Sequence, residues 1–137
     1  RTPGAIQDDI VRRLHELWPT FDALLVLDQV SEEDCGVVTS RVRAAVAELA
    51  ANDPSKFVLA DSRERIGLFR NVCVKPNERE LETAWQCGKD IAESVDILAT
   101  ALREIGRAAF VTEGANGITL YKPEAGSIVI REVPAYP

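Results

Sequence analysis

The stretch Val72-Cys73-Val74-Lys75-Pro76-Asn77-Glu78-Arg79-Glu80 joins a short apolar strand to the start of a helix. Junctions of this kind bind phosphates in open α/β sheets, because the N–H groups of the first helical turn point outward and the helix dipole favours an anion. Lys75 at the strand end, followed by Asn77 and Glu80, gives this junction polar groups that a generic turn lacks. The junction is therefore the first candidate for a functional site.

Two interpretations of Asn77 and Glu80 are compatible with the sequence. Their spacing is that of a capping box, in which Asn77 accepts from the N–H of Glu80 and the Glu80 carboxylate accepts from the N–H of Asn77. The same two residues would also suit a Mg²⁺ and phosphate site, with Asn77 near the phosphates and Glu80 holding a metal-bound water. Lys75 would then supply a point charge to a phosphoryl group.

Helices and strands alternate on both sides of this junction. Upstream, the patterns predict a helix over 6–17, an apolar strand over 24–27 ending at Asp28, a helix from Thr39 or Ser40 to about Ala51, and a strand over 57–60 ending at Asp61. Downstream they predict helices over 78–87 and 90–105 and strands over 108–113, 118–121 and 127–133. We expect an α/β fold with a mostly parallel, Rossmann-like sheet flanked by helices and an antiparallel C-terminal margin. The continuous apolar run 24–27 predicts a strand buried on both faces.

Composition narrows the class of protein. With 137 residues, 46% of them hydrophobic and 28% charged, the chain is typical of one soluble domain. It lacks an apolar run of the roughly 20 residues that a membrane span needs, and no signal peptide is visible, so we expect a cytoplasmic protein without a membrane partner. The net charge of -6 argues against a nucleic-acid partner.

The cysteines and the single histidine exclude common metal sites. Cys35, Cys73 and Cys87 show no Cys-x-x-Cys spacing, and His15 is alone, so neither a zinc site nor a disulfide framework is expected. Cys73 lies inside a strand and is expected to be a buried small hydrophobe. The sequence contains no methionine, which suggests a segment of a longer protein.

The segment Thr112-Glu113-Gly114-Ala115-Asn116-Gly117 also has two interpretations. Asn116-Gly117 between apolar strands predicts a hairpin with a type I′ turn. Thr112, Gly114 and Gly117 also form a Thr-x-Gly-x-x-Gly pattern, in which glycines let the backbone approach a nucleotide.

Two further acids end strands. Asp28 and Asp61 lie where carboxylates face the ligand crevice of a parallel sheet. Each of them would also serve to cap a loop. Arg63 and Arg65 follow Asp61; they would meet a substrate phosphate or, as we expect, lie in solvent.

In their order and spacing these pieces resemble the ribokinase-like, or PfkB, family of carbohydrate kinases. The resemblance is carried by the strand ends Asp28 and Asp61 with Arg65 after the second, by Val-Lys-Pro-Asn-Glu-Arg-Glu-Leu-Glu at 74–82, and by Val-Thr-Glu-Gly-Ala-Asn-Gly at 111–117. It implies phosphorylation of a sugar or sugar-phosphate hydroxyl with ATP and Mg²⁺. It also implies that Asn77 and Glu80 organise Mg²⁺ and phosphates, while Thr112, Gly114 and Gly117 border the nucleotide.

The resemblance also implies what residues 1–137 lack. Family members carry the catalytic base in a Gly-Ala-Gly-Asp segment, which is expected beyond Pro137, and their sugar-binding and lid part precedes the region matched here. Residues 1–137 are thus expected to be a partial ribokinase-like domain that is inactive alone. A non-catalytic nucleotide- or phosphate-binding module is the alternative function, and a purely structural α/β domain is a third.

Overall fold

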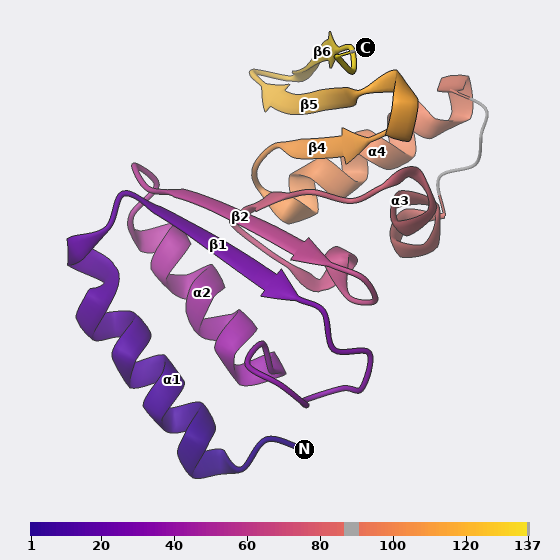
Figure 1. Ribbon diagram of the computed structural model, residues 1–137. Helices are drawn as coiled ribbons and strands as arrows, with labels where there is room; N and C mark the ends of the chain where they lie inside the picture. Colours follow the sequence, from indigo (N-terminus) through magenta and orange to yellow (C-terminus); the bar gives the residue numbers. More distant parts are fainter. Residues whose placement is uncertain (87–90, 137) are drawn as a thin grey trace.

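The computed structural model describes residues 1–86 and 91–136 (Figure 1). Helices and strands follow one another in the order that the sequence predicts. The helices are α1 (Gly4–Leu17), α2 (Ser40–Asn52), α3 (Glu78–Trp85) and α4 (Ile91–Ile105). The strands are β1 (Ala23–Asp28), β2 (Phe57–Ser62), β3 (Cys73–Val74), β4 (Ala109–Thr112), β5 (Ile118–Glu124) and β6 (Ser127–Val133). Short 3₁₀ turns lie at η1 (Trp18–Thr20), η2 (Ile66–Leu68) and η3 (Gly114–Asn116).

The described strands form a six-stranded sheet in the order β1-β2-β3-β4-β5-β6. Strands β1 to β4 are parallel, and β4, β5 and β6 pair antiparallel. The predicted α/β fold with an antiparallel C-terminal margin is therefore confirmed. Because parallel strands share one carboxyl edge, Asp28, Asp61, Lys75 and Thr112 all come to that edge of the sheet.

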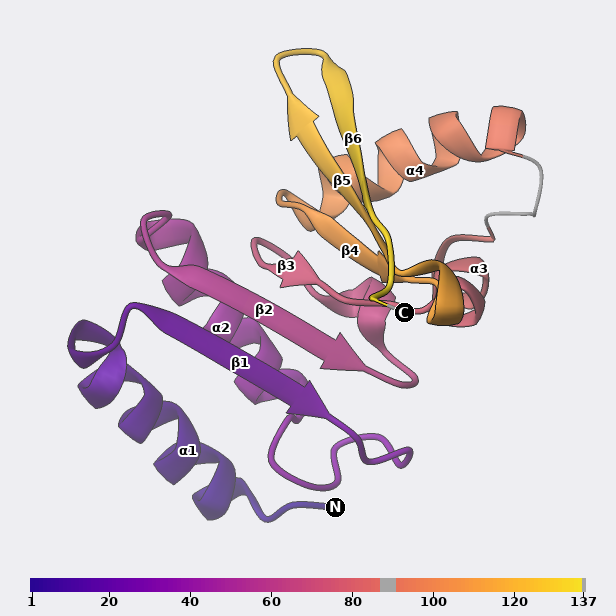
Figure 2. The same ribbon diagram turned by 45° about the horizontal axis from the view of Figure 1, so that its top comes forward.

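Helices α1, α2 and α4 lie on one side of the sheet (Figures 1 and 2). The core forms between them and the strand residues that point to the same side. Its most buried side chains, each at most 1% exposed, include Val58, Phe69, Val74, Leu102 and Ile105. Burying a side chain of this size stabilises the fold by about 1.5–3 kcal/mol. Within the described residues, no helix combines the length and hydrophobicity needed to cross a membrane.

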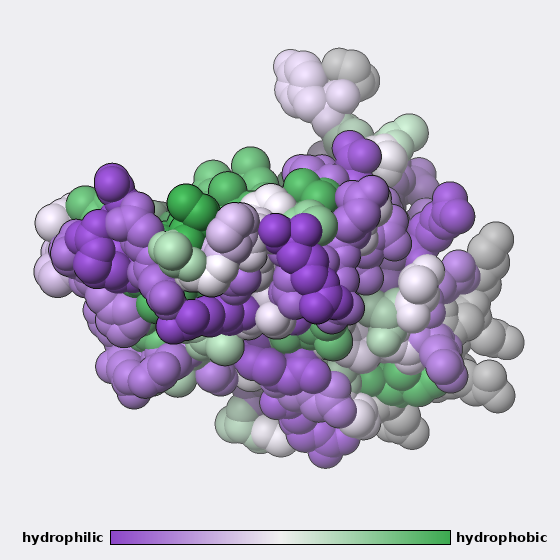
Figure 3. All heavy atoms as spheres, turned by 90° about the horizontal axis from the view of Figure 1, so that it is seen from below, coloured by the Kyte–Doolittle hydropathy of each residue, from purple (hydrophilic) through white to green (hydrophobic). Residues whose placement is uncertain are grey.

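The opposite face of the sheet is open in the described part of the chain. Leu25 and Leu27 are 63% and 62% exposed, and Phe57, whose ring meets Phe110 edge-on at 6.4 Å, is 43% exposed. The prediction that 24–27 is buried on both faces is therefore wrong, because β1 is an edge strand and the helices cover one side only. Figure 3 shows hydrophobic side chains gathered along one margin of the molecule.

Thr39 joins the first two helices. Its hydroxyl accepts from the N–H of Val42 at 3.3 Å, which caps α2, and donates to Oε1 of Gln7 in α1 at 2.9 Å. Thr39 is fully buried, so both of its hydrogen bonds are shielded from water.

We expect Thr39→Ala to lower the free energy of unfolding by about 1–2 kcal/mol, because it removes the cap and leaves the half-buried amide oxygen of Gln7 without its donor. Thr39→Ser keeps the hydroxyl and is expected to cost less than half as much. Urea denaturation measures both changes, and equal losses for the two variants would contradict the assignment of the effect to the hydroxyl.

Candidate functional site

Asn77 caps α3 with the geometry that the sequence predicts. Its Oδ1 accepts from the N–H of Glu80 at 2.8 Å, and Oε2 of Glu80 accepts from the N–H of Asn77 at 2.8 Å. The capping-box interpretation is thus confirmed. Because a carboxylate has two acceptor oxygens, Glu80 can accept further hydrogen bonds beside the one from Asn77.

The start of α3 lies beside the end of β4. Asn77 and Thr112 form a parallel β-bridge, and the N–H of Thr112 donates to the carbonyl of Pro76 at 2.9 Å. Pro76 is fully buried, which fixes the backbone at this point. Two segments that the sequence singled out separately are therefore neighbours, and Thr112 presents the following loop to the first turn of α3.

The loop after Thr112 is not a type I′ turn. That turn requires a positive φ at both central residues, and Asn116 has none. Pairing between β4 and β5 ends at Thr112 and Ile118, so five residues connect the strands and η3 forms within them. The N–H of Glu113 donates to the carbonyl of Gly117 at 2.8 Å and closes this loop.

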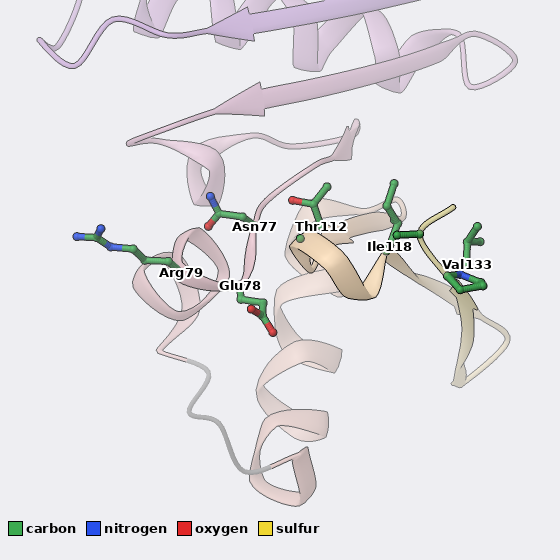
Figure 4. A pocket seen from close by; sticks show the side chains of 10 residues that line it. Asn77, Glu78, Arg79, Thr112, Ile118 and Val133 are labelled. Atoms are coloured by element: carbon green, nitrogen blue, oxygen red, sulfur yellow. The ribbon is translucent and has the colours of Figure 1, made fainter. Parts of the chain in front are cut away.

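A cavity of about 670 Å³ lies between these segments (Figure 4). Its size is that of a small-molecule site. It is lined by Asn77, Glu78, Arg79, Thr112, Gly114, Gly117, Ile118, Val133, Pro134 and Ala135. Asn77 and Thr112 stand on one side, Ile118 and Val133 on the other, and the Arg79 side chain extends away from that apolar side.

This cavity contains four of the predicted site residues and several that the sequence did not single out. Asn77, Thr112, Gly114 and Gly117 are brought together as expected. The residues that the sequence did not single out are Glu78, Arg79, Ile118 and the segment 133–135, and Ile118 pairs with Val133. Their large exposed fractions, 39% for Ile118 and 59% for Val133, are visible only in the folded chain.

Lys75 is paired with Asp61 at the same edge of the sheet. Nζ of Lys75 lies 3.0 Å from Oδ2 of Asp61, with the two side chains 35% and 25% exposed. An incoming phosphate would therefore share the Lys75 ammonium group with Asp61, and the phosphate role of Lys75 stays a prediction. Both groups remain accessible enough to change partners.

Asp28 and Arg65 form a buried ion pair. Nε and Nη2 of Arg65 donate to the two carboxylate oxygens of Asp28 at 3.1 and 3.0 Å, and the Ser62 hydroxyl donates to Oδ2 at 2.7 Å. Arg65 also donates to the carbonyls of Val30 and Ser31. The expectation that Arg65 lies in solvent is therefore wrong. The pair stabilises the loop after β1, and Arg65 also lines a second cavity together with Asn77 and Glu80.

Cys73 is buried, as its position in a strand predicts. It is 7% exposed, and burial raises the pKa of its thiol, which disfavours the reactive thiolate. Cys35 is half-buried, and Cys87 lies outside the described residues. Among the described residues, no group of three or more His, Cys, Asp and Glu side chains could hold a metal ion.

Comparison with solved structures identifies the fold. The chain resembles phosphofructokinase-2 from Escherichia coli, solved with fructose-6-phosphate, at 19% identity and a TM-score of 0.57 over 95% of this chain and 43% of that one. A protein described as ribokinase II from Escherichia coli matches at 14% identity and a TM-score of 0.53, over 93% of this chain and 41% of that one.

The fold is ribokinase-like. Phosphomethylpyrimidine kinase from Clostridium difficile matches as well, at 9% identity and a TM-score of 0.58 over 92% of this chain and 61% of that one. No protein-family model matches the sequence, and no curated protein does. Identities this low concern the fold alone. The chain spans less than half of the length of phosphofructokinase-2, so residues 1–137 correspond to part of that ribokinase-like fold.

Proposed function

We propose that this ribokinase-like chain is part of a kinase that transfers phosphate from ATP to the hydroxyl of a sugar or sugar phosphate, and that the cavity beside α3 binds the nucleotide. The observation that carries the proposal is the β-bridge between Asn77 and Thr112, which joins a capped helix start to a glycine loop in one ligand-sized cavity. Structural neighbours that are kinases support the reaction class.

The first turn of α3 provides the phosphate-binding groups. The capping box satisfies the N–H groups of Asn77 and Glu80. The N–H groups of Glu78 and Arg79 belong to the first turn, where a helix offers no internal acceptor, and both residues line the cavity. An anion at this position is also favoured by the helix dipole.

The donor groups at the site suit Mg²⁺ that arrives with the nucleotide. Mg²⁺ keeps several waters and needs only one or two protein carboxylates, and Glu80 offers one beside the cavity-lining Asn77. Glu80 would hold such a water, and Lys75 would attract the phosphates from the other side of the junction. Bound Mg²⁺ would supply charge neutralisation of the phosphates.

Transfer itself needs more than these residues. In-line phosphoryl transfer depends on positioning, on anion-stabilising donors and on a group that accepts the proton of the sugar hydroxyl. We place that base beyond Pro137, so residues 1–137 would bind nucleotide without turnover. In the whole protein, the sugar would be bound mainly by parts that precede Arg1.

Calorimetric titration of the chain with ATP and Mg²⁺, followed by a phosphate-transfer assay with a panel of sugars, tests this proposal. We expect binding and a ligand-dependent rise in stability without turnover. Absence of binding at millimolar ATP would contradict nucleotide recognition and favour a structural domain. Measurable transfer to a sugar would contradict the placement of the base outside these residues.

A further inference from the structure

The chain leaves β6 by crossing directly over Gly117. A Cβ atom at Gly117 would lie 2.1 Å from the carbonyl oxygen of Val133, 2.6 Å from the amide nitrogen of Ala135 and 2.8 Å from the carbonyl carbon of Pro134. All three contacts are with backbone, which cannot swing aside as a side-chain end can. Since β5 and β6 are already paired at Ile118 and Val133, the crossing segment is held close to Gly117.

The two other left-handed glycines between β4 and β6 do not share this demand, and a Cβ atom at Gly36 would meet the side chain of Val30 rather than backbone. Gly114 and Gly126 have φ values of +57° and +86°, but a Cβ at either position would meet nothing within 4 Å. Gly117, with φ of +103°, has both the unusual backbone and the close approach. A side chain at position 117 would therefore clash with backbone, whereas one at position 114 or 126 would not.

The crossing builds one wall of the nucleotide cavity. Val133, Pro134 and Ala135 line the cavity, and Figure 4 shows Ile118 and Val133 opposite Asn77 and Thr112. Displacing residues 133–135 by the length of a methyl group would move this wall relative to the first turn of α3. The cavity keeps its shape only while the backbone passes over a residue without a side chain.

We propose that Gly117 is a positioning residue, which sets the place of the backbone of residues 133–135 in the wall of the cavity. The identity of the ligand rests on the function proposed above; the steric role of Gly117 does not. The glycine pattern is thus divided: Gly114 borders open space in the cavity, and Gly117 sets the position of the facing wall.

Gly117→Ala tests the inference, with Gly126→Ala as the matched control. Both substitutions place alanine at a positive φ in a connection between C-terminal strands, but only at position 117 does the new Cβ atom meet backbone. Backbone amide NMR reports the position of Val133, Ala135 and Tyr136, and titration with ATP and Mg²⁺ reports binding. We expect Gly117→Ala to shift these amides and to weaken binding about ten-fold, and Gly126→Ala to change binding less than two-fold.

The outcomes separate the inference from the function. If wild-type chain binds ATP and Gly117→Ala shifts the amides yet binds equally well, the positioning role is wrong and the function stands. If Gly117→Ala leaves the amides of 133–136 in place, the steric argument itself is wrong. If wild-type chain does not bind ATP, the proposed function fails, and displaced amides would still support the steric half. If Gly117→Ala is too unstable to assign at room temperature, its amide spectrum and titration are recorded at lower temperature and judged by the same criteria.

Discussion

Replacing Arg65 with alanine is expected to lower the free energy of unfolding by about 3–5 kcal/mol. The Arg65 and Asp28 side chains are only 10% and 2% exposed, so the substitution leaves the Asp28 carboxylate buried without its cation. It also removes the hydrogen bonds that hold the carbonyls of Val30 and Ser31. Because a small domain has about 5–15 kcal/mol of stability in total, this one change threatens the fold.

Arg63→Ala is the matched control for Arg65→Ala. Arg63 is an exposed arginine two residues earlier, and its hydrogen bond to Gln29 lies at the surface. We expect its loss to change stability by less than about 0.5 kcal/mol. Arg65→Lys keeps the positive charge but cannot donate to both carboxylate oxygens of Asp28 in the same way. We expect its loss of stability to lie between those of Arg63→Ala and Arg65→Ala. Urea denaturation that shows equal effects for Arg63→Ala and Arg65→Ala would contradict the role of the buried pair.

Replacing Glu80 with glutamine is expected to weaken Mg²⁺-dependent binding of ATP about ten-fold or more, the loss usual for residues that hold a metal's ligands. Glutamine can still accept from the N–H of Asn77, so the capping box survives. We therefore expect the free energy of unfolding to change by less than about 0.5 kcal/mol. Titrations with and without Mg²⁺, next to urea denaturation, measure both quantities.

Asn77→Asp and Asn77→Ala extend this test. Aspartate retains the cap but places a negative charge at the phosphates, whereas alanine loses the cap at a cost of about 1 kcal/mol. We expect both to bind ATP more weakly. If Glu80→Gln bound Mg²⁺·ATP normally and only destabilised α3, Glu80 would be a capping residue and nothing more.

Much of the fold could be predicted because it depends on local patterns. Apolar runs and helical periodicity mark the strands and helices, and the spacing of Asn77 and Glu80 marks the start of α3. The end of β1 at Asp28 follows from the same patterns, and β2 ends at Ser62, one residue after the predicted Asp61. The parallel order of the sheet follows from the alternation of helices and strands.

The type I′ turn predicted at Asn116 and Gly117 is a local error, whereas the other errors concern contacts between distant residues. Arg65 lies 37 positions after Asp28, and nothing local says that its charge is buried. The apolar run 24–27 has the composition of a strand that is buried on both faces of the sheet. Its actual burial depends on which helices pack on each face. Likewise, residues 133–135 form a wall of the cavity only because β5 and β6 pair and the chain then crosses over Gly117. The spacing of the glycines does not reveal this crossing.

The most direct test of the central claim is a backbone amide NMR titration of the chain with ATP and Mg²⁺. We predict that the largest shifts cluster at the first turn of α3, residues 77–80, and at the loop 112–117, with smaller shifts at residues 133–136. Shifts confined to another region, or their absence at saturating ATP, would contradict the assignment of a nucleotide site to the junction of Asn77 and Thr112.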